Sequence, residues 1–260
     1  MKHDFPTLFK YEFFNVLRGR WLIAYALLFA GFSAALLQFG GDGSKAAVSL
    51  MNVILLVVPA VSCLFPAIYW YSSEGFTTLL LTQPLRRKRI YLARWMAVSA
   101  GLSCGFLGGS AFPLVWGGLL DAGTAGLLLL GTALTWVFVA VGLWLGAAVP
   151  DRMKGIGLAF LVWFYFSVVH DALVFGVFVA FREYPLEVPA LVLHLLSPVD
   201  LVRVALLMSL DVSALMGFSG ALLQKHLGGS TGLAVAVGSL AVWTVVPVYL
   251  GARRFGRRDF

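Results

Sequence analysis

The sequence is poor in charged residues and in cysteine. Charged side chains make up 12% of its 260 residues, about half their share in ordinary globular domains. The two cysteines, Cys63 and Cys104, are too few for a disulfide framework or a four-ligand zinc site. No segment matches the GxxxxGK(S/T) phosphate loop, so any ATP that the protein uses is expected to bind to another chain. The composition argues against a soluble enzyme and against a disulfide scaffold.

Hydrophobic residues are abundant instead. They make up 60% of the chain, and the mean hydropathy is +0.92. The 21 phenylalanines and eight tryptophans cannot all be buried, because a chain of this length leaves about a quarter of its surface in contact with solvent. Lipid is the solvent that suits them. The net charge of +7 does not indicate nucleic-acid binding, since the basic residues lie at the ends of apolar runs.

Stretches of about 20 apolar residues can cross a bilayer as helices. Six such stretches occur, at residues 21–39, 47–71, 95–120, 124–149, 156–181 and 232–252. No internal repeat or soluble-sized linker separates them, which predicts a single all-α, polytopic membrane domain over residues 1–260. If the N-terminus is cytoplasmic, fifteen of the nineteen basic residues fall on the cytoplasmic side. These cytoplasmic segments are residues 1–20, 72–94, 150–155 and 253–260. The positive-inside rule therefore predicts that both termini are cytoplasmic.

Residues 182–231 are the most ambiguous part of the chain. Residues 205–223 are apolar enough to span, but Asp211 near their centre would cost ~2.5–3.5 kcal/mol, and an odd number of spans would carry the C-terminal arginines outside. We expect an extracytoplasmic segment with one or two short interfacial helices, and a pair of extra spans remains an alternative. In Ser197-Pro198-Val199-Asp200, the serine is suited to cap a helix that begins at the proline.

The first cytoplasmic segment has the pattern of an amphipathic helix. Apolar residues recur at helical spacing from Phe5 to Leu17, with Lys10, Glu12 and Asn15 between them. A helix of this kind is expected to lie along the inner surface of the membrane before the first span.

The second cytoplasmic segment, residues 72–94, predicts a short helix that begins near Ser73 and ends before Pro84. Such a helix is expected to carry Glu74, Thr77 and Thr78 on a polar side. Four consecutive basic residues, Arg86 to Arg89, follow it. The segment is either an ordinary positive-inside loop or a helix on which a soluble partner docks.

Ionisable residues inside a span are functional candidates, and His170 and Asp171 lie within the fifth predicted span. They could act as an acid–base pair or carry a proton, or Asp171 could be a buried hydrogen-bonding residue. Adjacent side chains point about 100° apart on a helix, which is poor geometry for joint action on one atom. Cys63 and Cys104 fall at similar predicted depths, so they could form a pair of soft sulfur ligands. They could equally be small apolar residues of the core.

Small residues recur at every fourth position of the third predicted span, which allows another helix to approach closely. They are Ala97, Gly101, Gly105 and Gly109. Packing within one subunit and packing between two subunits are both compatible with this stripe.

The interfacial helix, the six spans and the order Glu74-Gly75-x-Thr77, leucines, Pro84 and basic residues resemble the ABC-2-type permeases. The outer motif Ser197-Pro198-Val199-Asp200-Leu201-Val202-Arg203, followed by Met216-Gly217 and Gly220, is similar to the membrane subunit of the ABC transporter that helps to mature nitrous oxide reductase. That subfamily often has Asn-Pro-x-Asp where this chain has Ser197.

The resemblance implies a transporter subunit rather than an enzyme, with no cofactor of its own. It implies a multi-pass protein of the bacterial inner membrane, two copies of the chain and two copies of an ATPase that binds ATP and magnesium. The expected ATPase-contacting residues are Glu74, Gly75, Thr77, Thr78, Pro84, Arg86 and Arg87.

The subfamily also implies an extracytoplasmic accessory protein, and copper or sulfur supply is a possible task. The expected partner or cargo residues are Ser197, Pro198, Asp200, Arg203 and Met216. The competing functions are an ion-coupled secondary transporter and a membrane-embedded enzyme, each using His170 and Asp171.

Overall fold

The computed structural model describes residues 4–39, 43–83, 85–118, 121–181, 192–209 and 230–257, and within them it contains helices and no strand. The first helices in chain order are α1 (Asp4–Leu17), α2 (Arg20–Phe39), α3 (Gly43–Ser72), α4 (Glu74–Leu81), α5 (Arg87–Trp116) and α6 (Ala122–Ala148). They are followed by α7 (Arg152–Phe164), the π-helical turn η1 (Tyr165–Val169), α8 (His170–Ala180), α10 (Pro198–Ser209) and α12 (Ser230–Arg257). The expectation of an all-helical chain is confirmed for these residues.

Five of the described helices are long and apolar enough to cross a membrane. They cover Ala47–Ser72, Arg87–Trp116, Gly123–Ala148, Arg152–Ala180 and Val235–Arg257. A sixth is reached only if α1 and α2 count as one span, with a bend of 62° between them. The six predicted stretches thus correspond to helices, although α5 begins at Arg87 rather than at residue 95.

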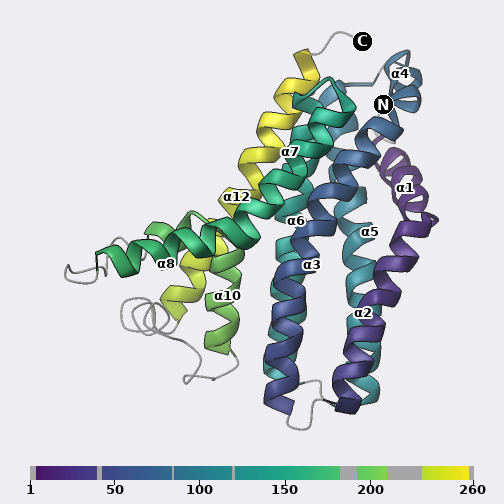
Figure 1. Cartoon of the computed structure of the whole chain (residues 1–260). Helices are drawn as coiled ribbons and strands as arrows, with labels where there is room; N and C mark the ends of the chain where they lie inside the picture. The colour runs from purple at the N-terminus through teal and green to yellow at the C-terminus, as the bar shows by residue number, and fades with distance from the viewer. Residues whose placement is uncertain are drawn as a thin grey trace.

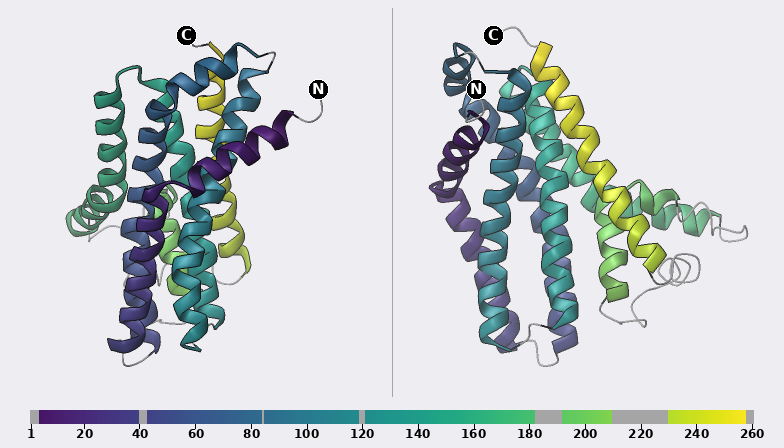
Figure 2. Two further views of the ribbon diagram at one scale, coloured as in Figure 1. Left: turned by 90° about the vertical axis from the view of Figure 1, so that its right-hand side faces the viewer. Right: turned by 180° about the vertical axis from the view of Figure 1, so that it is seen from behind.

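The start of α1, the end of α12 and the short α4 all lie at one end of the bundle (Figure 1). We call this the terminal end. The end of α2, the start of α3, the end of α5 and the start of α6 lie at the opposite end (Figures 1 and 2).

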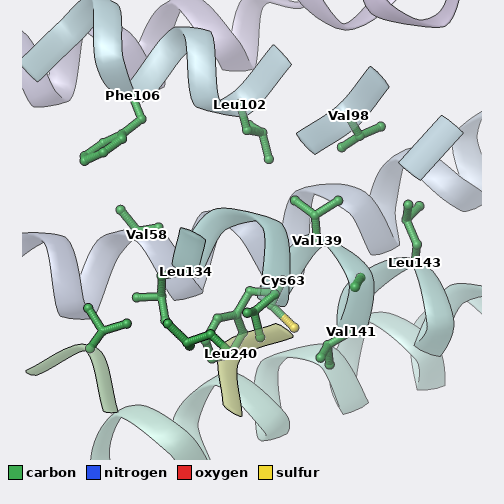
Figure 3. Packing of buried hydrophobic residues seen from close by; sticks show 14 of the residues in the cluster. Val58, Cys63, Val98, Leu102, Phe106, Leu134, Val139, Val141, Leu143 and Leu240 are labelled. Atoms are coloured by element: carbon green, nitrogen blue, oxygen red, sulfur yellow. The ribbon is translucent and has the colours of Figure 1, made fainter. Parts of the chain in front are cut away.

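Helix α6 lies at the centre of the bundle, between α3 on one side and α12 on another. Its side chains Leu134, Val139 and Leu143 are fully buried. Figure 3 shows them among Val58 and Cys63 of α3 and the side chains of α5. This apolar packing holds the spans in fixed positions relative to one another.

The stripe of small residues on α5 packs against α1 and α2 of the same chain. A Cβ atom on Gly101 would lie 2.6 Å from Val16, and one on Gly105 would lie 2.7 Å from Leu22. A Cβ atom on Gly109 would lie 2.4 Å from the backbone carbonyl oxygen of Ala26. Of the two alternatives that the sequence left open, packing within one subunit explains these glycines.

The fifth predicted span is not one uniform helix. The π-helical turn η1 interrupts it, and beyond this turn α8 leaves the bundle at a steep angle to α3 and α6 (Figures 1 and 2). Only 17% of the apolar window in this span is buried. Hydropathy could predict the length of this segment but not the break, because the residues on both sides of the break are apolar.

Helix α10 packs on α6 and α12, and Val199, Val202 and Leu206 are buried in that contact. The sequence led us to expect short helices lying at or dipping into the outer interface, and α10 is a short helix that packs against the spans. The predicted helix start is confirmed, because α10 begins at Pro198 and the Ser197 hydroxyl oxygen accepts a hydrogen bond of 3.2 Å from the amide of Asp200. Residues 210–229, in which a further short helix or extra spans were considered, lie outside the described residues.

Candidate functional site

Helix α4 is a two-turn helix at the terminal end of the bundle, between α3 and α5 (Figure 1). Glu74, Gly75 and Thr78 are exposed, and so is Leu79, which is 66% accessible. The helix ends at Leu81, and Arg86 beyond it is exposed while Arg87 is partly buried. Pro84 lies outside the described residues. The exposed face of α4 is therefore a small mixed surface of polar and apolar groups.

Thr77 does not share that exposed face, contrary to the polar side expected from the sequence. It is buried, and its hydroxyl donates a hydrogen bond of 2.8 Å to the Ser73 carbonyl oxygen. The same hydroxyl oxygen accepts a hydrogen bond of 3.0 Å from the guanidinium of Arg94 in α5. Thr77 thus attaches α4 to the bundle, while Glu74 and Thr78 face outward.

Arg94 is the centre of this attachment. Its Nε and Nη2 atoms both donate to Oε1 of Glu12, at 3.1 and 3.0 Å, and both side chains are 1% exposed. The guanidinium also lies over the ring of Trp70, 5.3 Å from its centroid. A buried charge is tolerated when it is paired and its hydrogen-bonding groups are satisfied.

Glu12 comes from α1, so this ion pair connects the first helix to α4 and α5. The hydroxyl of Tyr69 in α3 also donates to Glu12, and the amide of Asn15 donates to the Tyr69 oxygen at 3.0 Å. We call Glu12, Asn15, Tyr69, Thr77 and Arg94 the Arg94 network. Four helices, α1, α3, α4 and α5, meet in it.

Sequence reasoning missed this network. It placed Glu12 on the polar side of an amphipathic helix and counted Arg94 among the basic residues of a cytoplasmic loop. In the structure, Leu8, Glu12 and Val16 lie on one buried face of α1. Their spacing of four residues was a signal that Glu12 faces inward, but it could not identify the partner.

A second polar cluster forms where α8 begins, beside α10. Nδ1 of His170 lies 2.9 Å from Oδ2 of Asp200, and Nδ1 of His194 lies 3.7 Å from the same oxygen. Arg203 pairs with Oδ1 of Asp200 at 3.1 Å and with Oδ2 of Asp171 at 2.8 Å. We call these five residues the Asp200 cluster.

The Asp200 cluster unites two predictions that were made separately. His170 and Asp171 were candidates within the fifth span, and Asp200 and Arg203 were candidates in the outer motif. His194, on a short helical turn at residues 192–195, was not predicted, because a lone histidine in an apolar segment carries no pattern. Met216 lies outside the described residues.

The Asp200 cluster is also where the described residues could hold a metal ion. One ligand atom from each of His170, Asp171 and Asp200 lies within 4.8 Å of the others. The two cysteines face different surroundings: Cys63 is buried, with its thiol 3.5 Å from the Ala159 carbonyl oxygen, and Cys104 is exposed.

Comparison with known proteins identifies the family of this chain. Residues 72–260 match the family model of an ABC-2 family transporter protein. The chain is 29% identical to the probable ABC transporter permease protein NosY of Stutzerimonas stutzeri, over 95% of this chain and 96% of that protein. It is 26% identical to the protein of the same name from Pseudomonas aeruginosa, over 95% of this chain and 93% of that protein. The chain belongs to the ABC-2 family of transporter proteins and is a permease similar to NosY.

Proposed function

We propose that this permease converts ATP hydrolysis by a separate ATPase subunit into movement of its spans, and that α4 is the element on which the ATPase docks. The observation that carries the proposal is the position of α4. One face of this helix is exposed, and the other is joined through Thr77 to the buried Arg94–Glu12 pair.

This connection gives a mechanical route from α4 into the bundle. A displacement of α4 acts on Arg94 in α5 through a direct hydrogen bond, and on α1 through Glu12. The ring of Tyr11 in α1 also stacks on Phe76 in α4, with centroids 5.0 Å apart. Because buried, charge-assisted hydrogen bonds are short and directional, α1, α4 and α5 are expected to move together.

The proposed orientation puts the terminal end in the cytoplasm of a bacterium, with the protein in the inner membrane. Basic residues at that end support this orientation. They include Arg253, Arg254 and Arg257, which line a groove of about 590 Å³ between α6 and α12, together with Trp144 and Leu250. Arginines beside apolar side chains suit the headgroup region of an anionic membrane.

In the proposed assembly, two copies of the permease bind two ATPase subunits, which hold the ATP and magnesium. A surface for a second copy is available on α7 and α8, where Leu161 and Phe175 are 59% and 71% exposed. Such large apolar side chains must face either lipid or another protein.

We further propose that the work of the transporter serves a protein or cargo beyond the membrane. The similarity to NosY permeases supports a role in maturing nitrous oxide reductase, through copper or sulfur supply or through conformational work on an extracytoplasmic partner. Ser197, Pro198 and Asp200 are buried, so among the described residues of this motif the partly exposed Arg203 is the proposed contact.

Mild-detergent purification of the tagged permease tests the docking assignment. We expect an ATPase with a phosphate loop to copurify and to be lost from Glu74→Lys, which reverses a charge on the exposed face of α4. Lys154→Glu is the matched control, because it reverses an exposed charge in the first turn of α7, and it is expected to retain the ATPase.

Retention of the ATPase by Glu74→Lys would refute docking on α4. Purification without any ATPase, combined with transport driven by an ion gradient, would instead support the secondary-transporter function of His170 and Asp171.

A further inference from the structure

The groove between α6 and α12 lies where α12 ends, at the terminal end of the bundle (Figure 1). Its volume of about 590 Å³ is within the range of about 300–1,000 Å³ that is typical of small-molecule sites. We propose that this groove binds one anionic glycerophospholipid, with the guanidinium groups of Arg253, Arg254 and Arg257 on its phosphate oxygens. This inference goes beyond the proposed function, because ATPase docking on α4 requires no lipid at a defined site.

Small residues make the α6 side of the groove hollow. Ala147 and Ala148, at the end of α6, line it together with Trp144. These three positions share one face of the helix, because residues three and four apart are neighbours on its surface. The two alanines leave space that longer side chains would fill, and tryptophan is a residue that is enriched at the level of lipid headgroups.

The packing of α12 fixes which of its residues face the groove. Phe255 is fully buried, and the centroid of its ring lies 5.4 Å from that of Trp70 in α3. A Cβ atom on Gly251 would strike the hydroxyl of Tyr91 in α5, so this face of α12 is held close to the bundle. The neighbouring exposed face carries the arginines that line the groove, which are Arg253, Arg254 and Arg257.

The positive charge of these three arginines is not compensated by the described part of the chain. Within that part, no carboxylate forms an ion pair with any of them. The carboxylate of Asp151, one residue beyond the groove-lining Pro150, instead caps α7 by accepting a hydrogen bond of 2.8 Å from the amide of Lys154. Like charges three or four residues apart on a helix repel one another, so an anion in the groove is favoured.

An exposed apolar stripe on α12 continues from the groove and distinguishes a lipid from a free phosphate. Val242, Val246 and Tyr249 are 61%, 49% and 61% exposed. They lie on the same face as Leu250 and Arg253, because these positions recur at intervals of three or four residues. A cationic site at one end of an apolar stripe matches a phospholipid, which has an anionic headgroup and apolar chains.

The chemistry of the groove also defines the class of headgroup. The guanidinium group binds phosphate oxygens through paired hydrogen bonds, and basic pockets between transmembrane helices bind headgroups such as that of cardiolipin. Three guanidinium groups can pair with two phosphates. Cardiolipin, which has two, is therefore expected to bind more tightly than phosphatidylglycerol, which has one, and zwitterionic phosphatidylcholine is expected to bind most weakly.

Native mass spectrometry of the delipidated full-length permease, titrated with cardiolipin in detergent micelles, tests the proposal. We expect one cardiolipin per chain and an affinity at least about tenfold lower when all three groove arginines are replaced by glutamine, because the charge-assisted hydrogen bonds to phosphate are lost. The matched control removes three exposed cations of α1 and α5 and is expected to bind as the wild type does; it combines Lys10→Gln, Lys88→Gln and Arg89→Gln.

Ala148→Trp separates a built site from general attraction between positive charge and anionic lipid. The indole fills the groove while every arginine remains, so the affinity for cardiolipin is expected to fall at least about tenfold here as well. Ala148 is partly exposed at the end of α6, so the variant is expected to fold.

Several outcomes would overturn the lipid site. Undiminished binding by folded Ala148→Trp, an equal loss in the control variant, or equal affinity for phosphatidylcholine would show that the groove does not select the lipid. Displacement of cardiolipin by inorganic phosphate would assign the groove to a free phosphate group. Loss of the copurified ATPase from the arginine variant, with lipid binding unchanged, would assign these arginines to the ATPase.

Discussion

The Arg94–Glu12 pair makes a quantitative prediction about stability. Among the described residues, Glu12→Leu leaves the buried guanidinium with the Thr77 hydroxyl as its one hydrogen-bond partner, and Arg94→Leu leaves a buried carboxylate with the Tyr69 hydroxyl alone. Removing one member of a buried ion pair costs about 3–5 kcal/mol, because the remaining charge is uncompensated. Each single variant is therefore expected to lose that much free energy of unfolding.

The double variant Glu12→Leu with Arg94→Leu should lose much less than the sum of the two single losses. It leaves no buried charge: the Thr77 hydroxyl keeps its hydrogen bond to the Ser73 carbonyl oxygen, while the Tyr69 hydroxyl loses its acceptor, at about 1–3 kcal/mol. The single losses add to about 6–10 kcal/mol and the double loss is about 1–3, so the coupling energy is expected to be at least about 3 kcal/mol.

The assay measures unfolding of the purified permease in mixed micelles as the fraction of a denaturing detergent is raised. Tryptophan fluorescence monitors the unfolding. Arg89→Leu is the matched control, since it removes an exposed arginine from the same helix and should change stability by less than about 0.5 kcal/mol. Losses that simply add, within about 0.5 kcal/mol, would show that Glu12 and Arg94 do not act as a pair.

Three further substitutions test other parts of the structure in the same assay. Thr77→Val should destabilise the protein by about 1–3 kcal/mol because it removes a buried hydrogen bond to a charged group, whereas Thr78→Val on the exposed face should be nearly neutral; equal effects would contradict the inward position of Thr77. Gly109→Ala should cost about 1–3 kcal/mol because its Cβ would strike a backbone carbonyl of α2, whereas Gly108→Ala has open space and should be tolerated. Asp121→Ala should cost about 1 kcal/mol by removing the cap of α6. Hydrogen bonds from the backbone amide and the hydroxyl of Thr124 hold the pKa of Asp121 below its ordinary value. The stability that Asp121 contributes is therefore present above the unfolded-state pKa and is lost as the pH falls through the folded-state pKa. Unfolding measured at a series of pH values checks this dependence.

The number of helices and their apolar character could be predicted because both depend on local sequence. Span length follows from hydropathy, and the start of α10 follows from the Ser197 cap and Pro198, which act within one turn. The exposed positions of Glu74 and Thr78 also follow the expected pattern on α4.

The two polar networks could not be predicted, because their members are distant in sequence. Glu12 and Arg94 are 82 residues apart, and no local pattern pairs them. The approach of His170 to Asp200 depends on the break in the fifth span and on the burial of α10, and both are decided by tertiary packing. In each case the sequence indicated that a polar residue was unusual but could not give its partner.

The π-helical turn η1 has a consequence for the rotational phase of the fifth span. An α-helix turns by about 100° per residue, and a π-helical turn uses one more residue, so it rotates everything beyond it relative to a continuous α-helix. The side of α8 that faces the bundle is thus not the side that would face it if α7 and α8 formed one continuous α-helix. Loss of a single residue between Tyr165 and Val169 would turn His170 away from Asp200 without altering α7.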